Sequence, residues 1–250
     1  MLVDSHCHLN YLDDPQAAIV RARQAGIDRL LCIGVEEATI EEVLQLATEH
    51  AHVYASVGEH PGSVSEDRSW VRENLAGDRV VAVGETGLDY HYVTQEEERA
   101  RQRRSFEEQL QIAQDFDLPV IVHTRSAVAD TLALINNFPA VRGVLHCFTE
   151  SLQMAETAME MGYCISISGI VTFNAADNVR EVARVIPDDR LLIETDSPWL
   201  APVPKRGNTN EPSYLVHTCE YLAALRGVDA DALATLTADN FDRLFGTGSS

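Results

Sequence analysis

The sequence predicts a single (β/α)8 barrel, an α/β TIM barrel in which eight parallel strands form a ring inside a layer of helices. Short apolar runs rich in Val, Ile and Leu alternate with longer helical patterns along the whole 250-residue chain. The short runs are apolar throughout, which is typical of parallel strands buried on both faces. Eight such strand–helix units favour a closed barrel over an open doubly wound sheet, and the glycines form no dinucleotide fingerprint.

The apolar runs define the expected strands and the segments between them define the helices. The first strand opens at residues 2–3, and the others cover 29–33, 53–57, 80–84, 118–123, 143–146, 163–167 and 191–194. The helices cover 15–25, 36–50, 66–75, 95–116, 126–136, 152–161, 178–185, 212–225 and 230–244. Gly26 follows the first helical segment, where glycine commonly ends a helix. We therefore expect one domain over residues 1–246 and a disordered tail over 247–250.

Composition and charge limit the classes of function. A net charge of −20 argues against a long basic groove for duplex nucleic acid, but leaves open a small site that binds an anionic end with metals and a few local cations. No apolar run reaches membrane-spanning length, and no basic signal segment precedes the first histidines, so we expect a cytoplasmic protein without a membrane partner. Five scattered cysteines without a C-x-x-C pair indicate reduced thiols.

Side chains that commonly bind metals or phosphate stand where the strands are expected to end. His6 and His8 follow the first strand, and alternate residues of a strand point the same way, so their imidazoles are expected side by side. Taken singly, each such residue is more simply a hydrogen-bonded core histidine or a helix cap. The carboxyl ends of barrel strands meet at one face, however, so the set predicts a metal centre there. The other members are His60, Glu85, Asp89, His123, Arg125, His146, Glu194 and Asp196.

The number of ligands suggests two divalent cations, such as Mg, Mn or Zn. One group would contain His6, His8 and Asp196, the other His123 and His146, and Glu85 would bridge them. A hydroxide shared by the two metals would attack the substrate. Asp196 would take the proton of the bridging water as general base.

The sequence resembles the TatD family of metal-dependent deoxyribonucleases. The resemblance lies in DSHCH at 4–8, GEHP at 58–61, GETGLDY at 84–90, ETDSPWL at 194–200 and RGNTNEP at 206–212, together with His123 and His146. It extends to about residue 245 and implies a TIM barrel. It also implies a dinuclear site with His6, His8, Glu85, His123, His146 and Asp196 as ligands, and His60 near the substrate phosphate. Phosphotriesterase-type relatives use a carbamylated lysine where Glu85 stands, and no lysine ends a strand here.

Several further residues are candidates for contact with the substrate. Arg125, Lys205 and Arg206 offer donors for a phosphate, although each is also explained as a solvated surface residue. Asp89 is expected to orient a ligand or to cap a turn. Trp199 and Phe148 flank ligands and are interpreted either as stacking platforms for a base or as rim packing.

The leading hypothesis is a two-metal enzyme that cleaves DNA phosphodiester bonds, as a 3′–5′ exonuclease on single-stranded DNA, with Asp196 and Glu85 as catalytic residues. The substrate and polarity follow from the family resemblance, and His60 or Arg125 would stabilise the developing charge. The alternative keeps the site but changes the bond to an ester, a lactone, an amide or a D-aminoacyl-tRNA ester. A non-catalytic acidic binding module that keeps a metal for structure is the third hypothesis. The sequence predicts no oligomeric state.

Overall fold

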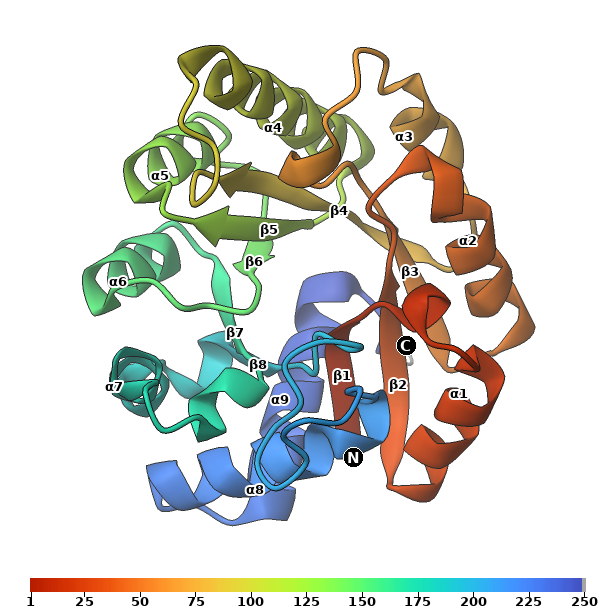
Figure 1. Ribbon diagram of the computed structural model, residues 1–250, viewed down its shortest axis with the longest axis vertical. Helices are drawn as coiled ribbons and strands as arrows, with labels where there is room; N and C mark the ends of the chain where they lie inside the picture. The colour runs from red at the N-terminus through yellow and green to blue at the C-terminus, as the bar shows by residue number, and fades with distance from the viewer. Residues whose placement is uncertain (249–250) are drawn as a thin grey trace.

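The computed structural model describes residues 1–248 and confirms the predicted barrel. The described residues form an eight-stranded sheet in which sequential strands are neighbours and every paired edge is parallel. The strands are β1 (Leu2–Cys7), β2 (Ile27–Ile33), β3 (Val53–Val57), β4 (Val80–Asp89), β5 (Val120–Arg125), β6 (Gly143–Leu145), β7 (Cys164–Ile167) and β8 (Leu191–Ile193). Figure 1 shows the helices arranged around this ring of strands.

The helices follow the strands in the predicted order. They are α1 (Pro15–Gln24), α2 (Ile40–Glu49), α3 (Ser69–Asn74), α4 (Glu96–Phe116), α5 (Val128–Asn136), α6 (Leu152–Glu160), α7 (Asp177–Val185), α8 (Leu215–Arg226) and α9 (Ala230–Phe245). Several begin at a side chain that accepts a hydrogen bond from an otherwise unpaired backbone N–H. Asp14 caps α1, Ser151 caps α6 and Asp229 caps α9 in this way.

Strand β4 is longer than its expected 80–84 run and includes Glu85. Two glycines permit this, because a Cβ at Gly84 would lie 2.6 Å from the Ile121 carbonyl oxygen and one at Gly87 would collide with the His123 backbone. The close approach lets β4 continue to pair with β5 as far as Asp89 and Arg125. Glu85 therefore lies inside strand β4 and not in a loop, at the register shift between the Val83–Val120 and Thr86–Val122 pairs.

The seam between β1 and β8 is joined by hydrogen bonds from residues in and beyond the strands. The Asp196 backbone N–H donates to the His6 carbonyl at 2.9 Å, and the His8 N–H donates to the Ser197 carbonyl at 2.8 Å. The Ser5 hydroxyl donates to the Ile193 carbonyl at 2.9 Å. The seam therefore fixes the segment that follows β8 against the histidines of β1.

Apolar side chains fill the barrel interior at the end where the strands begin. Side chains such as Val3 and Ile121 pack there with Phe241, Leu244 and Phe245 of α9. A larger cluster fills the layer between the strands and the outer helices. Because α9 covers one end of the barrel, the other end is left for the functional residues.

No helix within residues 1–248 is both long and apolar enough to cross a membrane. Of the tail expected at 247–250, the Thr247 hydroxyl donates to Asp242 Oδ1 at 2.7 Å. Residues 249–250 lie outside the described residues.

Candidate metal centre

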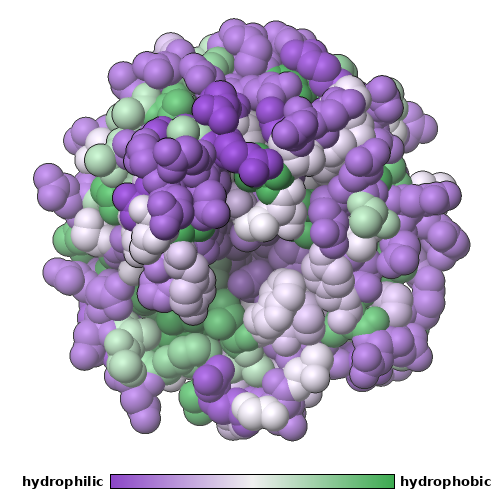
Figure 2. Space-filling model, turned by 45° about the horizontal axis from the view of Figure 1, so that its top comes forward, coloured by the Kyte–Doolittle hydropathy of each residue, from purple (hydrophilic) through white to green (hydrophobic). Residues whose placement is uncertain are grey.

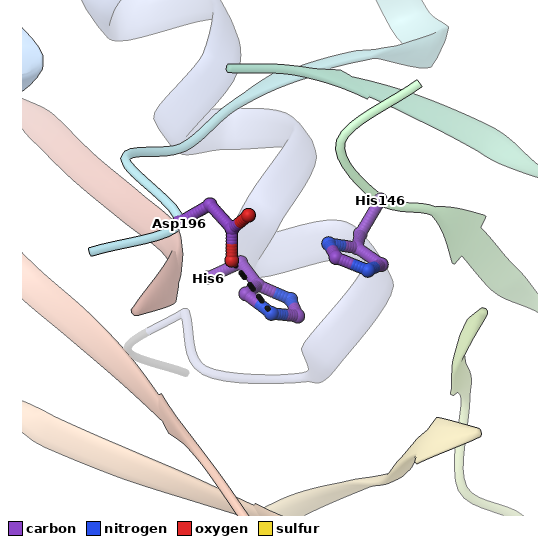
Figure 3. Close-up of side chains that lie close together, drawn as sticks. All are labelled: His6, His146 and Asp196. Atoms are coloured by element: carbon purple, nitrogen blue, oxygen red, sulfur yellow. Dashed lines mark ion pairs between the residues drawn. The ribbon is translucent and has the colours of Figure 1, made fainter. Parts of the chain in front are cut away.

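The six expected ligands meet at the carboxyl end of the barrel. His6, Glu85 and His123 lie in β1, β4 and β5, whereas His8, His146 and Asp196 lie in the turns after β1, β6 and β8. Figure 3 shows His6, His146 and Asp196 converging from separate parts of the chain. Residues up to 190 positions apart in the sequence are thus brought into one cluster by the strand order.

The Glu85 carboxylate lies between two groups of ring nitrogens. Its Oε2 is 3.4 Å from Nε2 of His6 and 3.7 Å from Nε2 of His8. Its Oε1 is 2.7 Å from Nε2 of His146 and 3.2 Å from Nδ1 of His123. This division has the form expected if Glu85 bridges two cations.

Asp196 completes the first group. Its Oδ1 lies 3.7 Å from Nε2 of His6 and 3.6 Å from Nε2 of His8. The residue adopts a positive φ of 55°, which turns the chain immediately after β8 so that its side chain faces β1. The carboxylate is therefore placed by the backbone and by the seam.

The donor set fits divalent metal ions. Nε2 of His6 and Nε2 of His8 are only 3.2 Å apart, and the rings of His6 and His146 stack with centroids 3.9 Å apart. Three sets of ligand atoms lie within 4.8 Å of one another: His6, His8 and Glu85; His6, His146 and Asp196; and His60, Glu85 and His123. A cation at such a point would satisfy nitrogens and carboxylate oxygens that otherwise face one another.

The protonation of the carboxylates suits the same interpretation. Burial alone would raise the pKa of Glu85, but the charge of His146 and the hydrogen bonds from His123 and His146 lower that pKa well below its ordinary value. Burial also opposes ionisation of Asp196, and the hydrogen bond from His8 and the charge of His6 lower its pKa. Ionised carboxylates are the form that binds metals.

His60 stands beside this cluster with a defined tautomer. Its Nδ1 accepts a hydrogen bond from the Gly62 backbone N–H at 2.9 Å, and its Nε2 lies 3.6 Å from Glu85 Oε1. Burial lowers the pKa of His60 to about 4, so the ring is neutral near pH 7. A neutral ring that accepts at Nδ1 carries its proton at Nε2, which makes His60 better suited to donate to a substrate than to bind a metal.

A cavity of about 550 Å³ opens above the cluster. Arg125 and His60 line it together with five of the six expected ligands, all except His6. Asp89 does not line the cavity, but its Oδ2 lies 3.3 Å from Nε2 of His123. Asp89 also accepts a hydrogen bond from the His91 backbone N–H. It therefore both caps a turn and faces His123, one of the expected metal ligands.

Lys205 and Arg206 lie outside the cavity lining. The Lys205 ammonium is 5.0 Å from the centroid of the Tyr214 ring, and the Arg206 guanidinium is 3.9 Å from that of Phe173. These contacts account for the positions of both side chains. A role for Lys205 and Arg206 in binding the substrate stays a prediction.

Two buried carboxyl groups that are not among the six expected ligands, Glu194 and Asp4, lie behind them. Glu194 Oε1 lies 3.4 Å from Nδ1 of His146. Asp4 accepts hydrogen bonds from the backbone N–H and the hydroxyl of Thr195 at 2.9 Å and 2.5 Å. The one signal for them in the sequence was position, because Glu194 follows the apolar run of β8 and stands two residues before Asp196.

Ionised carboxylates and histidines clustered at the carboxyl end of a (β/α)8 barrel define a metal-dependent hydrolase. Comparison with known proteins identifies the particular family. The family model described as TatD related DNase matches residues 3–246, and the chain belongs to that family.

Relatives and solved structures agree with this assignment. The chain is 45% identical to the uncharacterized metal-dependent hydrolase YcfH of Escherichia coli K12, over 98% of this chain and 95% of that protein. It is 36% identical to the 3'-5' ssDNA/RNA exonuclease TatD of Erwinia amylovora, over 94% of this chain and 95% of the relative. The crystal structure of YJJV, a TatD homolog from Escherichia coli K12, superposes with a TM-score of 0.90 at 31% identity, covering 99% of this chain and 98% of that one. The protein is therefore a metal-dependent hydrolase of the TatD family.

Proposed function

We propose that this enzyme removes nucleotides from the 3′ end of single-stranded DNA with two divalent cations. The proposed ligands are His6, His8, Glu85, His123, His146 and Asp196. The observation that carries the proposal is the division of the Glu85 oxygens between two groups of ring nitrogens. Bridging carboxylates are typical of hydrolases in which two cations act on one phosphate. The Erwinia amylovora relative is a 3'-5' ssDNA/RNA exonuclease by name, which supports DNA as the substrate.

Bound cations would supply Lewis acidity and lower the pKa of water at the site. The chain's own residues would then orient the substrate and move protons. Asp196, ionised and facing the cavity, would accept the proton of the attacking water as general base. The Nε2–H of His60 and the guanidinium of Arg125 would donate to phosphate oxygens and stabilise the charge that develops on them.

Cleavage of a labelled oligonucleotide tests this function. We expect single-stranded DNA labelled at its 5′ end to shorten progressively from the 3′ end in the presence of Mg²⁺ or Mn²⁺. Asp196→Asn should slow the reaction by about 100- to 10,000-fold, the usual contribution of a general base. Glu85→Gln should slow it comparably, because Glu85 faces both groups. Glu41→Gln, an exposed substitution on α2, is the matched control and should leave the rate unchanged.

Carboxyl esters, a lactone and a D-aminoacyl-tRNA ester should be assayed beside DNA. Faster turnover of one of these than of DNA would replace the proposed substrate while keeping the site. Full DNA cleavage by Asp196→Asn and Glu85→Gln would refute the assigned residues.

A further inference from the structure

Two aromatic side chains form a corner of the cavity beside His8. The ring centroids of Tyr11 and Trp199 are 5.8 Å apart with an interplanar angle of 60°, and the Trp199 centroid is 5.1 Å from that of His8. Both rings line the cavity, and both are exposed, Trp199 to 50%. We refer to Tyr11 and Trp199 as the aromatic corner.

Rim packing does not explain this exposure. Phe148, the other aromatic residue that flanks a ligand, is only 2% exposed and belongs to the main hydrophobic core. The structure thus separates two residues for which the sequence left the same two interpretations open. Phe148 packs, whereas Trp199 leaves half of an indole facing solvent, at the cost of unburied apolar surface.

The corner is held in place by hydrogen bonds. The Trp199 backbone N–H donates to the Asp196 carbonyl at 3.0 Å, and its carbonyl accepts from Nδ2 of the buried Asn210 at 2.6 Å. The Tyr11 hydroxyl donates to Glu36 Oε1 at 2.9 Å. The Trp199 backbone and the Tyr11 side chain are therefore fixed before a ligand binds, which reduces the ordering cost of binding.

The cavity has an apolar end and a cationic end, with the expected ligands between them. Leu200 follows β8, as Trp199 does, and Ile170 follows the neighbouring strand β7. Thr124 and Arg125 instead end β5, on the other side of the ring of strands. Figure 2 shows a recess in one face of the molecule, bordered at its lower left by hydrophobic surface. A phosphodiester centred on the ligands would therefore direct one attached group toward the corner.

We propose that the aromatic corner is a subsite that stacks on the nucleobase of one of the two nucleosides joined by the scissile phosphate. This inference rests on the proposed function and specifies how its substrate is recognised. A nucleobase presents a flat face that stacks on indole and phenol rings regardless of base identity. The Glu36 carboxylate, bonded to the Tyr11 hydroxyl, would repel a phosphate, so a base and not the strand backbone occupies this end. Since a paired base is stacked within its duplex, the subsite accepts unpaired ends.

Binding of a nucleotide that has no scissile bond tests the subsite without catalysis. We use the Mg²⁺-loaded enzyme with dAMP, and deoxyribose 5-phosphate as the ligand that lacks a base. Trp70 is 5% exposed, so a base should quench chiefly the emission of Trp199. We expect dAMP to quench the fluorescence saturably and deoxyribose 5-phosphate to leave it unchanged. By calorimetry, Trp199→Leu should weaken dAMP binding by about 5- to 150-fold, the equivalent of one lost stacking contact. Trp199→Phe should retain most of the affinity.

Oligonucleotides with one abasic residue test the subsite during cleavage. The abasic residue is placed on either side of the scissile phosphate. At one of the two positions, the wild-type enzyme should lose about 5- to 150-fold in kcat/KM relative to normal DNA. Trp199→Leu should cleave normal and abasic DNA at nearly equal rates. Tyr221→Leu, an exposed aromatic residue on α8 outside the cavity lining, is the matched control and should retain the wild-type ratio.

The outcomes separate the two proposals. Equal ratios of abasic to normal DNA in the wild-type enzyme and in Trp199→Leu, together with dAMP binding that does not depend on Trp199, would overturn the subsite while DNA cleavage stands. An enzyme that binds dAMP through Trp199 but cleaves no DNA would keep the base-binding subsite and refute the exonuclease.

Discussion

The carboxylate of Glu194 faces the ring nitrogen of His146 that points away from Glu85. Glu194 Oε1 lies 3.4 Å from His146 Nδ1, while Nε2 of the same ring lies 2.7 Å from Glu85. Glu194 is fully buried. Within the described residues, no donor forms a hydrogen bond with either of its carboxylate oxygens. A buried carboxylate without another function at this position is suited to hold the imidazole with Nδ1 protonated, which leaves Nε2 free for a metal.

Replacing Glu194 should weaken metal binding without changing the ligand set. We expect Glu194→Ala to lower the affinity for Mn²⁺ by about 10- to 100-fold, the usual effect of removing a carboxylate that orients a ligand. Glu194→Gln keeps an acceptor for Nδ1–H and should lose less. Activity measured against Mn²⁺ concentration gives the comparison, with Glu41→Gln as control. An unchanged metal affinity in Glu194→Ala would show that His146 needs no such partner.

Metal binding should stabilise the folded protein. Ring nitrogens that are 3.2 Å apart face each other in the described structure, and a ligand that binds only the folded state stabilises it by mass action. At a hundredfold excess over its dissociation constant, one cation contributes about 2.7 kcal/mol. For a chain of this length that energy raises the melting temperature by roughly 5–10 °C. We expect Mn²⁺ to produce this shift in protein first treated with a chelator.

Sodium chloride at the same ionic strength is the control for that shift. Glu85→Gln should lose most of the shift, because Glu85 faces both groups of histidines. A shift of equal size in that variant would mean that the cation binds elsewhere.

Close backbone packing beneath Glu85 should make Gly58 intolerant of a side chain. A Cβ at Gly58 would lie 2.6 Å from the carbonyl carbon of Gly84, the residue before Glu85. We expect Gly58→Ala to destabilise the fold by about 1–3 kcal/mol, as overpacking usually does, and to displace Glu85 from the ligands. Urea unfolding and a metal titration measure the two effects. Gly77→Ala, whose Cβ would lie 3.1 Å from a Val80 methyl group, should affect stability but leave metal binding intact.

The barrel and the convergence of the six expected ligands could largely be predicted from the sequence, because strands buried on both faces and their polar ends are local patterns. The extent of β4 did not follow, because the pairing of Gly87 and Asp89 with β5 depends on how closely another strand approaches. The side chains that contact Asp4 and Glu194 could likewise not be predicted from the sequence. Asp4 contacts Thr195 across the seam, 191 positions away, and no local pattern encodes such a contact.

Asp4 should make the stability of the metal-free protein depend on pH. Burial raises the pKa of Asp4 to about 8, from 3.8 for an exposed carboxyl group. Between these values the folded carboxyl group is neutral while the unfolded one is ionised, so unfolding releases a proton. The contribution of Asp4 to stability is therefore fully present below about pH 4 and is lost as the pH rises through about 8, by up to about 1.4 kcal/mol per pH unit.

Asp4→Asn removes this titration and keeps an acceptor for the Thr195 N–H. The free energy of unfolding in urea, with a chelator present, should fall more steeply in the wild type than in Asp4→Asn between about pH 5 and about pH 8. Parallel profiles would mean that Asp4 is ionised in the folded protein.

The positions of Arg125 and Arg206 predict that replacing each by Ala will affect a different property: kcat/KM for Arg125 and the free energy of unfolding for Arg206. Arg125 lines the cavity, whereas Arg206 packs on Phe173 and donates to the Ala201 carbonyl at 3.2 Å. A hydrogen bond to a charged group contributes about 1.5–3 kcal/mol, so Arg125→Ala should lower kcat/KM on single-stranded DNA by roughly 10- to 150-fold.

Arg206→Ala should instead lower the free energy of unfolding by about 1 kcal/mol, through loss of the cation–π contact, and change kcat/KM by less than about 3-fold. Both variants remove one positive charge from a protein of net charge −20, so a general electrostatic effect on DNA binding would reduce both rates equally. Equal losses that disappear at high salt would therefore contradict a specific role for Arg125, whereas a loss confined to Arg125→Ala that persists at high salt identifies a direct contact with the phosphate.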